Sequence, residues 1–464
     1  MNRQEQSSRP NYSRGQFEIM APVGSRESLA AAIKAGANSV YFGIGKLNMR
    51  SHSANPFTID DLKEIAQICH ENGLKSYLTV NTIIYGEDIE TMHEIVDAAK
   101  EANISAVIAS DIAVLTYCAK VGQEVHLSTQ LNISNIEALK FYAQFADVVV
   151  LARELNMWQV KDIYDQIVAQ DIRGPKGELI RIEMFCHGAL CMAISGKCYL
   201  SLQNAGRSAN RGECVQICRR AYGVEATTPN LPQGDESVYY AKEVRDDAQP
   251  AGAGDGVELK IDNKYIMSPK DLKTIQFIDI MMNAGVRVFK IEGRARGPEY
   301  VYTVVKAYDE AINSVINGTF AEADKEEWDR QLSTVFNRGF WDGYYQGQRL
   351  GEWCDVYGSK ATEKKVYCAK CTKYFAKIGV AEFVVENCDI TPADKMLVTG
   401  PTTGALIQQV GELRVDDPND SHKSYPVEKA SKGDVISIKV NDRVRLNDRM
   451  YVLVKDESQQ LTQK

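Results

Sequence analysis

The chain has 464 residues, a net charge of −8, 44% hydrophobic residues and 25% charged residues. These values are typical of a globular enzyme, and the length leaves room for a large barrel and a smaller domain. The acidic balance excludes a protein that coats nucleic acid by charge alone, so any RNA site has to be locally basic. The sequence contains no apolar run of about eighteen residues, so no membrane span is expected.

The first sixteen residues, MNRQEQSSRPNYSRGQ, contain no apolar stretch. They predict a disordered tail over 1–16 and not a secretory signal. Eleven cysteines without such a signal favour a reducing compartment, where thiols bind metals or pack and do not form disulfides. We therefore expect a cytoplasmic protein.

From residue 17 the sequence alternates strands with helices. The expected strands are near-continuous apolar runs, as in parallel strands buried on both faces, and they cover 17–24, 39–45, 74–81, 105–110, 124–130, 147–153, 181–188 and 286–293. Ser268 and Pro269 are expected to begin a helix over 268–285, and a last helix covers 298–318. Eight such units predict a TIM-like (β/α)8 barrel over 17–318. A doubly wound open sheet is the alternative, but no G-x-G-x-x-G opens the first helix.

The remaining segments differ in composition. A stretch rich in Pro, Gly, Asp and Glu predicts a surface insertion over 225–256, and residues 319–360 read as a helical, aromatic connector. Short β-like runs over 361–464 predict a small C-terminal antiparallel β-barrel domain. Within it, Cys368 and Cys371 are expected to pack, because residues three apart on a strand point to opposite faces.

Residues 183–219 form a cysteine-rich segment that holds Cys191, Cys198, Cys214 and Cys218. Four thiolates suit a soft metal, either an iron–sulfur cluster or a tetrahedral zinc ion. The C-x6-C and C-x3-C spacing differs from the two short pairs of zinc fingers and favours the cluster. Packing with redox chemistry, and a cysteine nucleophile, remain open alternatives.

The position of this segment predicts where the thiolates lie. They fall between the seventh strand and the seventh helix, in a connection of roughly eighty residues where two to six are usual. Such connections lie at the C-terminal face of a barrel, where active sites are built. We therefore expect the cysteines over the barrel mouth.

Polar residues at the other strand ends become candidates by the same argument. They are Asn81, Gln130, Arg153, His187, Lys290, Glu292, Arg294 and Arg296. Arg153, Arg294 and Arg296 could clamp a carboxylated or phosphorylated ligand, with Asn81, Gln130 and Lys290 as further substrate contacts. His187 or Glu292 would move protons.

Three stretches carry a family resemblance: EMFCHGALCMAISGKCYLS at 183–201, KIEGRARGPEYV at 290–301 and EIMAPVGSRESL at 18–29. They resemble the peptidase U32 family, the collagenase-like proteases, whose members include prephenate-dependent tRNA uridine hydroxylases and an rRNA cytidine hydroxylase. The resemblance implies a [4Fe-4S] cluster on Cys191, Cys198, Cys214 and Cys218. Cys186 lies outside the cysteines of that signature.

The resemblance also implies an activity, which is 5-hydroxylation of the tRNA wobble uridine with prephenate, a dicarboxylate, as the hydroxyl source. An rRNA cytidine is the second substrate. The expected partners are tRNA or rRNA, the dicarboxylate, and a protein that delivers electrons or clusters, without a membrane. A peptidase is the alternative, although a cysteine peptidase needs no further thiols and no H-E-x-x-H is present. A non-catalytic cluster-bearing scaffold is the third interpretation.

Overall fold

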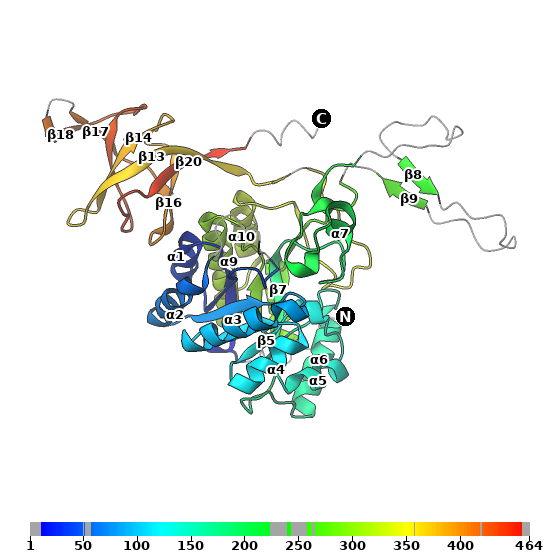
Figure 1. The fold of residues 1–464 in the computed structure, drawn as a ribbon. Helices are drawn as coiled ribbons and strands as arrows, with labels where there is room; N and C mark the ends of the chain where they lie inside the picture. The colour runs from blue at the N-terminus through cyan, green and yellow to red at the C-terminus, as the bar shows by residue number, and fades with distance from the viewer. Residues whose placement is uncertain are drawn as a thin grey trace.

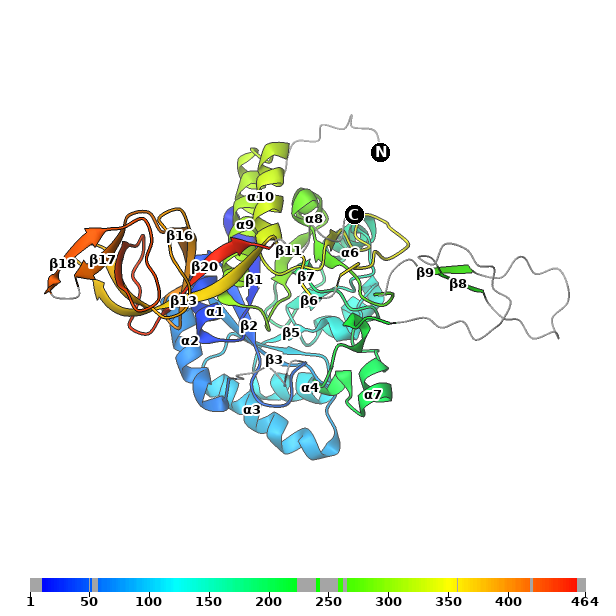
Figure 2. The same cartoon turned by 90° about the horizontal axis from the view of Figure 1, so that it is seen from above.

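Eight parallel strands form a closed barrel with helices around it (Figures 1 and 2). The computed structural model describes residues 11–49, 51, 57–222, 239–242, 258–261, 265–356, 358–417 and 420–456. In pairing order the barrel strands are β1 (Glu18–Pro22), β2 (Ser39–Phe42), β3 (Lys75–Val80), β4 (Ala106–Ala109), β5 (Val125–Leu127), β6 (Val148–Val150), β7 (Arg181–Gly188) and β11 (Val286–Ile291). Because β11 pairs in parallel with both β7 and β1, the ring closes. The predicted TIM-like barrel is confirmed, and an open sheet is excluded.

Helices cover the outside of the barrel. They are α1 (Arg26–Lys34), α2 (Leu62–Glu71), α3 (Ile89–Glu101), α4 (Ile112–Val121), α5 (Ile136–Ala143), α6 (Met157–Ala169), α8 (Ile278–Asn283) and α9 (Pro298–Asn317). The turn before α2 shows how local sequence sets these bounds, because Asp61 accepts a 2.7 Å hydrogen bond from the Thr58 backbone in a capping box. Ile65 and Cys69 follow at helical spacing and are fully buried against the barrel.

The expected helix over 268–285 is wrong in its first half. Residues Asp271–Lys273 form a short strand, β10, which pairs antiparallel with the end of β7, and α8 begins only at Ile278. The end of β7 runs past the barrel ring, so its backbone groups need a partner that β10 supplies. A second short strand, β12 (Phe340–Trp341), pairs in parallel with β10.

An antiparallel eight-stranded sheet follows the barrel and confirms the expected small C-terminal β-domain (Figure 1). Its strands pair in the order β16 (Gly404–Gln409), β15 (Lys395–Gly400), β20 (Arg449–Lys455), β13 (Glu363–Phe375), β14 (Val380–Val385), β19 (Val435–Lys439), β17 (Leu413–Asp417) and β18 (Asp420–Pro426). Its core is separate from that of the barrel and includes the fully buried Phe383, Ile436 and Met450.

One disulfide corrects the expectation that the thiols only bind metals or pack. Cys368 on β13 is bonded to Cys388, with the two Cα atoms 4.8 Å apart. Cys371 is a free, buried thiol, as expected for packing. The local C-x-x-C spacing of Cys368 and Cys371 carries no sign of a partner for Cys368 that is twenty residues away.

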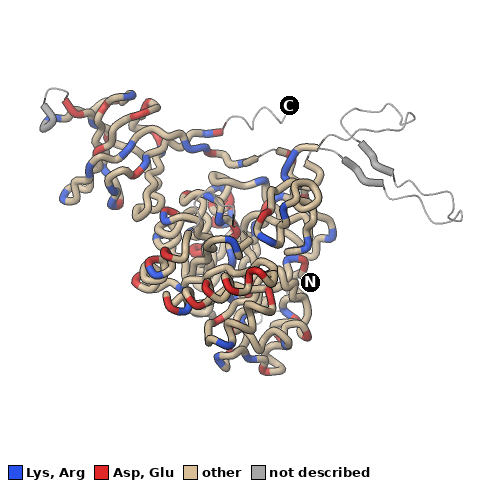
Figure 3. The backbone as a smooth tube through the Cα atoms, viewed as in Figure 1, with Lys and Arg blue, Asp and Glu red and all other residues tan. Residues whose placement is uncertain are grey.

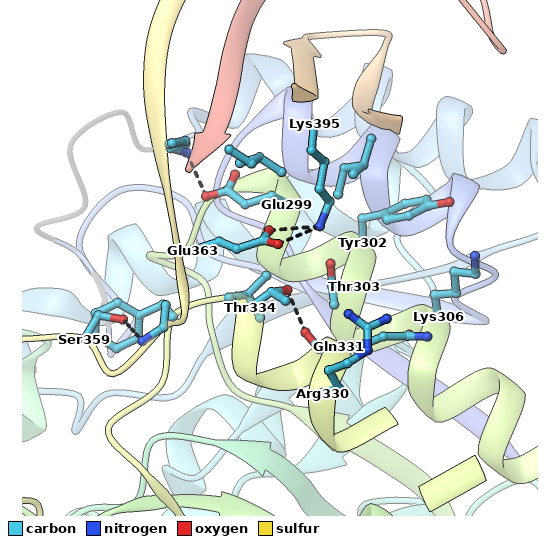
Figure 4. A pocket seen from close by; sticks show the side chains of 16 residues that line it. Glu299, Tyr302, Thr303, Lys306, Arg330, Gln331, Thr334, Ser359, Glu363 and Lys395 are labelled. Atoms are coloured by element: carbon cyan, nitrogen blue, oxygen red, sulfur yellow. Dashed lines mark hydrogen bonds and ion pairs between the residues drawn. The ribbon is translucent and has the colours of Figure 1, made fainter. Parts of the chain in front are cut away.

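The C-terminal sheet packs on the barrel through α1 and α9. Gly404 approaches α1 so closely that an added Cβ would lie 2.6 Å from the Ala31 nitrogen. A cavity of about 380 Å³ remains at this junction, between α9, α10 (Glu322–Thr334) and the sheet (Figure 4). At its rim Lys365 pairs with Glu299 at 2.7 Å, so the two domains are also joined by charge.

Two expectations concern segments at the edge of the description. Residues 1–10 and most of the insertion at 225–256 lie outside the described residues. In this region the structure describes an antiparallel pair of strands, β8 (Tyr239–Lys242) and β9 (Glu258–Ile261). The disordered tail is wrong for residues 11–16, because Arg14 forms a 2.6 Å ion pair with Asp309. Among the described residues, no helix is both long and apolar enough to cross a bilayer.

The lower part of the barrel interior holds a charged group where branched apolar residues are usual. Glu18 is buried, and its carboxylate accepts hydrogen bonds from Tyr77 at 2.6 Å and Lys75 at 3.0 Å and pairs with Arg181 at 3.2 Å. Burial alone would raise the pKa of Glu18, but these positive charges and the Tyr77 hydroxyl lower it to about 2.

The lowered pKa of Glu18 predicts acid sensitivity. The carboxylate contributes stability that is fully present above its unfolded pKa of 4.5 and is lost as the pH falls towards 2. Between pH 6 and pH 3 the wild type should lose about 2 kcal/mol of unfolding free energy that Glu18→Gln does not lose. Urea unfolding at both pH values measures this difference. Parallel pH profiles for the two proteins would contradict it.

Candidate functional site

A cysteine lobe, defined as residues 189–222, follows β7 and lies at the carboxyl ends of the barrel strands (Figures 1 and 2). It contains the short helix α7 (Leu200–Ala205) and all four predicted thiolate ligands. The long βα connection therefore lies where the sequence predicted it, over the barrel mouth.

Two glycines allow the lobe to lie directly on the mouth. Gly212 (φ +84°) touches the backbone after β2, and an added Cβ would overlap the Asn48 carbonyl oxygen. Gly196 (φ +75°) lies over the end of β5, where an added Cβ would be 2.9 Å from Gln130 Cγ. Both positions need a left-handed backbone and close approach, which glycine alone combines without strain.

Arginine side chains fasten the same lobe at other points. Arg211 pairs with Asp88 and stacks at 4.3 Å on the Tyr85 ring, which ties the lobe to the end of β3. Arg153, at the end of β6, donates to Ser195 Oγ at 2.5 Å. Arg219 donates to Ser268 Oγ at 3.1 Å. The lobe is therefore held on several sides of the mouth.

The four cysteines of the lobe lie near its surface. Cys191 and Cys214 are exposed, and Cys198 and Cys218 are half-buried. Burial raises the pKa of the Cys218 thiol, and Arg219 opposes this effect. The other three thiols also raise that pKa, which places them within electrostatic reach of Cys218. They are not separately buried among aliphatic side chains.

A single metal ion is less well served by this arrangement. Among the described residues, no three His, Cys, Asp or Glu side chains are placed to ligate one ion. A four-iron cluster differs, because each thiolate binds a different iron and the ligands lie further apart. Four soft donors on one lobe fit a cluster by their chemistry.

A cavity of about 150 Å³ lies between the lobe and the mouth. It brings together the predicted contacts Asn81 and Gln130, whose side chains are hydrogen-bonded at 3.4 Å. The other lining residues are Met49, Ile83, Ser110, Asp111, Leu131, Gly196, Lys197 and Asn210. The cavity has both polar and apolar lining residues, and it lies between the ends of strands β3, β4 and β5 and the lobe. Lys197 was not predicted from the sequence. The only sign of a role for it was its position between Cys191 and Cys198.

Two of the three predicted arginines face the mouth. Arg294 donates to Thr79 Oγ1 at 2.8 Å and to Asn48 Oδ1 at 3.3 Å, and it is 8% exposed. Arg153 is equally buried and lies beside Cys191. Burial lowers the pKa of Arg153, but the nearby Cys191 thiolate raises it, and the net shift is upward. Each therefore places a positive charge under the lobe.

Arg296 and His187 are not part of this arrangement. Arg296 stacks at 3.3 Å on Phe336 of the connector, and burial followed by the nearby Arg338 lowers its pKa. His187 is 1% exposed and is enclosed by Tyr300, Tyr308 and Phe340. A register irregularity between β7 and β11 at this point turns its side chain away from the mouth.

Burial therefore disfavours the predicted proton-transfer role of His187. First burial and then the positive charge of Lys273 lower the pKa of His187 to about 3. The imidazole stays neutral and faces Tyr308, whose hydroxyl lies 3.4 Å from Nδ1. Glu292 remains a candidate, since it is half-buried at the mouth and accepts a 3.1 Å hydrogen bond from Tyr41.

Lys290 is committed to a buried network inside the barrel. Its ammonium lies 2.7 Å from Glu183 Oε1, and both side chains are buried. His126 lies 3.6 Å from the second Glu183 oxygen. Burial raises the pKa of Glu183, but Lys290 and His126 outweigh it and the net shift is downward. Glu183 and His126 were missed, although an acidic residue inside the apolar strand 181–188 was a visible signal.

Larger cavities exist away from the mouth. The junction cavity has about 380 Å³, and another of about 580 Å³ lies between α1, α2 and the β15–β16 turn. Figure 4 shows Lys395 paired with Glu363, both on the C-terminal sheet, and Lys365 pairs with Glu299 of α9 across the domain junction. We assign the functional site to the smaller mouth cavity, because polar groups from several strand ends converge there.

Comparisons with known proteins identify a family. A family model described as "Peptidase family U32" matches residues 24–355, which include the cysteine lobe and all of the barrel strands except β1. The chain is 59% identical to a protein named "Collagenase" from Porphyromonas gingivalis, covering 95% of this chain and 99% of that protein. It is 33% identical to "tRNA hydroxylation protein P1" of Bacillus subtilis, covering 72% and 74%. It is 30% identical to "23S rRNA 5-hydroxycytidine C2501 synthase" of Escherichia coli, covering 72% and 46%.

The buried Lys290–Glu183 pair gives a test of the barrel interior. Glu183→Gln leaves the Lys290 ammonium without its anion and should lower the unfolding free energy by about 3–5 kcal/mol. Glu101→Gln is the matched control, because its pair with Lys63 is exposed on both sides and should leave stability nearly unchanged. Urea unfolding at pH 7 compares the variants. Equal losses of unfolding free energy in the two variants would contradict a buried ion pair between Lys290 and Glu183.

Proposed function

The chain belongs to peptidase family U32, and from that premise we propose that it is an enzyme that hydroxylates a nucleobase in RNA. The wobble uridine of tRNA is the first candidate and an rRNA cytidine the second. Relatives named for tRNA hydroxylation and for an rRNA hydroxycytidine support this proposal. The reaction would replace a ring C–H bond by C–OH, and the hydroxyl donor would take up the displaced hydrogen in place of its own hydroxyl, so that the base is oxidised by two electrons and the donor is reduced by two.

One observation carries the proposal: the cysteine lobe is fastened over a cavity at the barrel mouth. Gly196 and Lys197 of the lobe line that cavity together with Asn81 and Gln130. The segment that carries the four cysteines therefore also forms one wall of the cavity that holds these amides. A flipped base could present its edge to these amides, because RNA-modifying enzymes read bases outside the stack.

Cys191, Cys198, Cys214 and Cys218 would hold a [4Fe-4S] cluster. When bound, such a cluster supplies redox and Lewis-acid chemistry beside the mouth. The buried Nε of Arg153 has no hydrogen-bond partner among the described residues, although Arg153 lies next to Cys191. A buried N–H group without a partner is costly, and an acceptor bound by the lobe would satisfy it.

The co-substrate would be a small dicarboxylate, and prephenate is the proposed hydroxyl source. Arg294 would bind one carboxylate, because its guanidinium lies at the mouth, where it donates to Thr79 and Asn48, and guanidinium groups bind carboxylates through paired hydrogen bonds. Arg153 would hold positive charge on the lobe side. Glu292, hydrogen-bonded to Tyr41, is the group we assign to proton transfer.

A peptidase is the second candidate, and the 59% identical relative named "Collagenase" favours it. A cysteine peptidase needs a thiolate paired with a base. The histidine nearest the lobe in sequence, His187, is buried with its pKa lowered to about 3 and faces Tyr308. The geometry therefore favours the hydroxylase.

The cluster predicts a defined metal content. Protein purified without oxygen should be brown and contain about four irons and four sulfides per chain. Cys198→Ala should lose colour and iron. Cys118→Ala is the control, since that thiol is buried in α4, and it should keep both. A colourless wild type that contains zinc would overturn the cluster.

The hydroxylase predicts a nucleoside product. With prephenate and tRNA, the wild-type protein should form 5-hydroxyuridine, detected by mass spectrometry of digested RNA, and Cys198→Ala should not. Arg294→Gln should raise the KM for the dicarboxylate roughly 10- to 100-fold, because a charged hydrogen bond contributes about 1.5–3 kcal/mol. Collagen peptide hydrolysis that survives Cys198→Ala, without hydroxylation by wild type, would establish the peptidase instead.

A further inference from the structure

The cysteine lobe is basic within an acidic chain. Residues 189–222 carry five lysine or arginine residues and one glutamate, whereas the whole chain has a net charge of −8. Figure 3 shows basic positions on the lobe, while α3 below it carries several acidic ones. A local positive field of this kind attracts a polyanion to one face of an otherwise acidic molecule.

The basic residues of the lobe divide into two groups. Arg211 and Arg219 are held by structural contacts with Asp88 and Ser268. The other three, Lys197, Arg207 and Arg220, have exposed side chains. In the part of the chain that the structure describes, these three form no ion pair, so their charges are available to a ligand.

Between these cations the lobe exposes unusually large apolar side chains. Tyr199 is 73% exposed, and Met192, Ile194 and Leu202 are 42–52% exposed. All four fall within eleven residues of sequence. Grouped exposed apolar side chains mark a binding surface, whereas single ones do not. An aromatic ring flanked by cations is the pattern of sites that stack unpaired bases and hold their phosphates.

We propose that the exposed face of the cysteine lobe is the platform that binds a single-stranded segment of the RNA substrate. Tyr199 stacks on a base. Lys197, Arg207 and Arg220 contact phosphates. This inference rests on the proposed function, since it assigns the surface that would present RNA to the mouth cavity.

The position of Lys197 connects this platform to the site. Its side chain lines the mouth cavity beside Asn81 and Gln130, while Tyr199 lies two residues further along the lobe. A strand held on the lobe therefore runs past the cavity, where one nucleotide can turn inward. RNA uses both features, since its phosphates pair with exposed cations and its unpaired bases stack on an exposed aromatic ring.

Binding is measured with the anaerobically purified protein and a labelled RNA hairpin that has a uridine-rich single-stranded loop. Tyr199→Ala should raise Kd roughly 5- to 150-fold, because stacking of one base contributes about 1–3 kcal/mol. Tyr199→Phe keeps the ring and should bind like wild type. Phe141→Ala, an exposed aromatic on α5, is the matched control and should also leave Kd unchanged.

The cations are tested through salt dependence. Each phosphate contact to a single strand contributes about 0.7 to the slope of log K against log salt. The variant Lys197→Ala/Arg207→Ala/Arg220→Ala should therefore lower that slope by about 2. A fully paired RNA duplex should bind more weakly than the hairpin loop. Iron content and thermal unfolding equal to wild type show that each variant is folded.

The outcomes separate this inference from the proposed function. If wild type hydroxylates RNA while Tyr199→Ala and the triple variant bind the hairpin like wild type, the platform is wrong and the function stands. If the variants lose binding but wild type forms no hydroxylated nucleoside, the platform stands and the function fails. If wild type does not bind the hairpin, or if it captures an acidic protein and no RNA, the platform is overturned.

Discussion

Close backbone contact between Gly212 and the Asn48 carbonyl holds the cysteine lobe against the barrel mouth, and the rest of the site depends on it. Without this contact the lobe would stand off by at least the width of a side chain. The 150 Å³ cavity would then lose one of its walls, and Lys197 would no longer lie beside Asn81 and Gln130. The arginine contacts to Asp88, Ser195 and Ser268 fix the lobe in rotation, but only glycine allows the approach.

The barrel below the lobe is unusual in its charged interior. Glu18 lies low in the barrel with Tyr77 and Lys75, while Glu183 lies higher with Lys290 and His126. Each buried carboxylate is matched by cations, which keeps both ionised in spite of burial. The floor of the mouth therefore contains paired charges. Above it, Tyr41 donates to the Ile291 carbonyl at 2.9 Å, and the Arg294 guanidinium lies 5.7 Å from the centre of the Tyr41 ring.

The sequence predicted the parts that repeat a physical rule many times. Eight apolar runs with intervening helices predicted the barrel. The long connection after residue 188 predicted that the cysteines lie over the barrel mouth. Individual side-chain directions were harder to predict. His187 follows Cys186 at a register irregularity that reverses strand alternation, and no pattern in the residues marks that irregularity. Arg296 turns to Phe336, which is forty residues away in sequence. The helix expected from Ser268 does not begin there, because residues Asp271–Lys273 form β10 and pair with the end of β7. This tertiary pairing overrides the local helix preference.

The short strand β12 has a consequence for how the two domains are joined. The connector enters as a further strand of the barrel sheet, paired with β10, and Trp341 donates to the Lys270 carbonyl at 3.1 Å. The connector thus attaches the C-terminal sheet to the barrel at β10, beside the end of β7 that leads into the lobe. The sheet also packs on α1. Through β12 and β10 the connector is therefore joined by backbone pairing to the end of β7, three residues before Cys191.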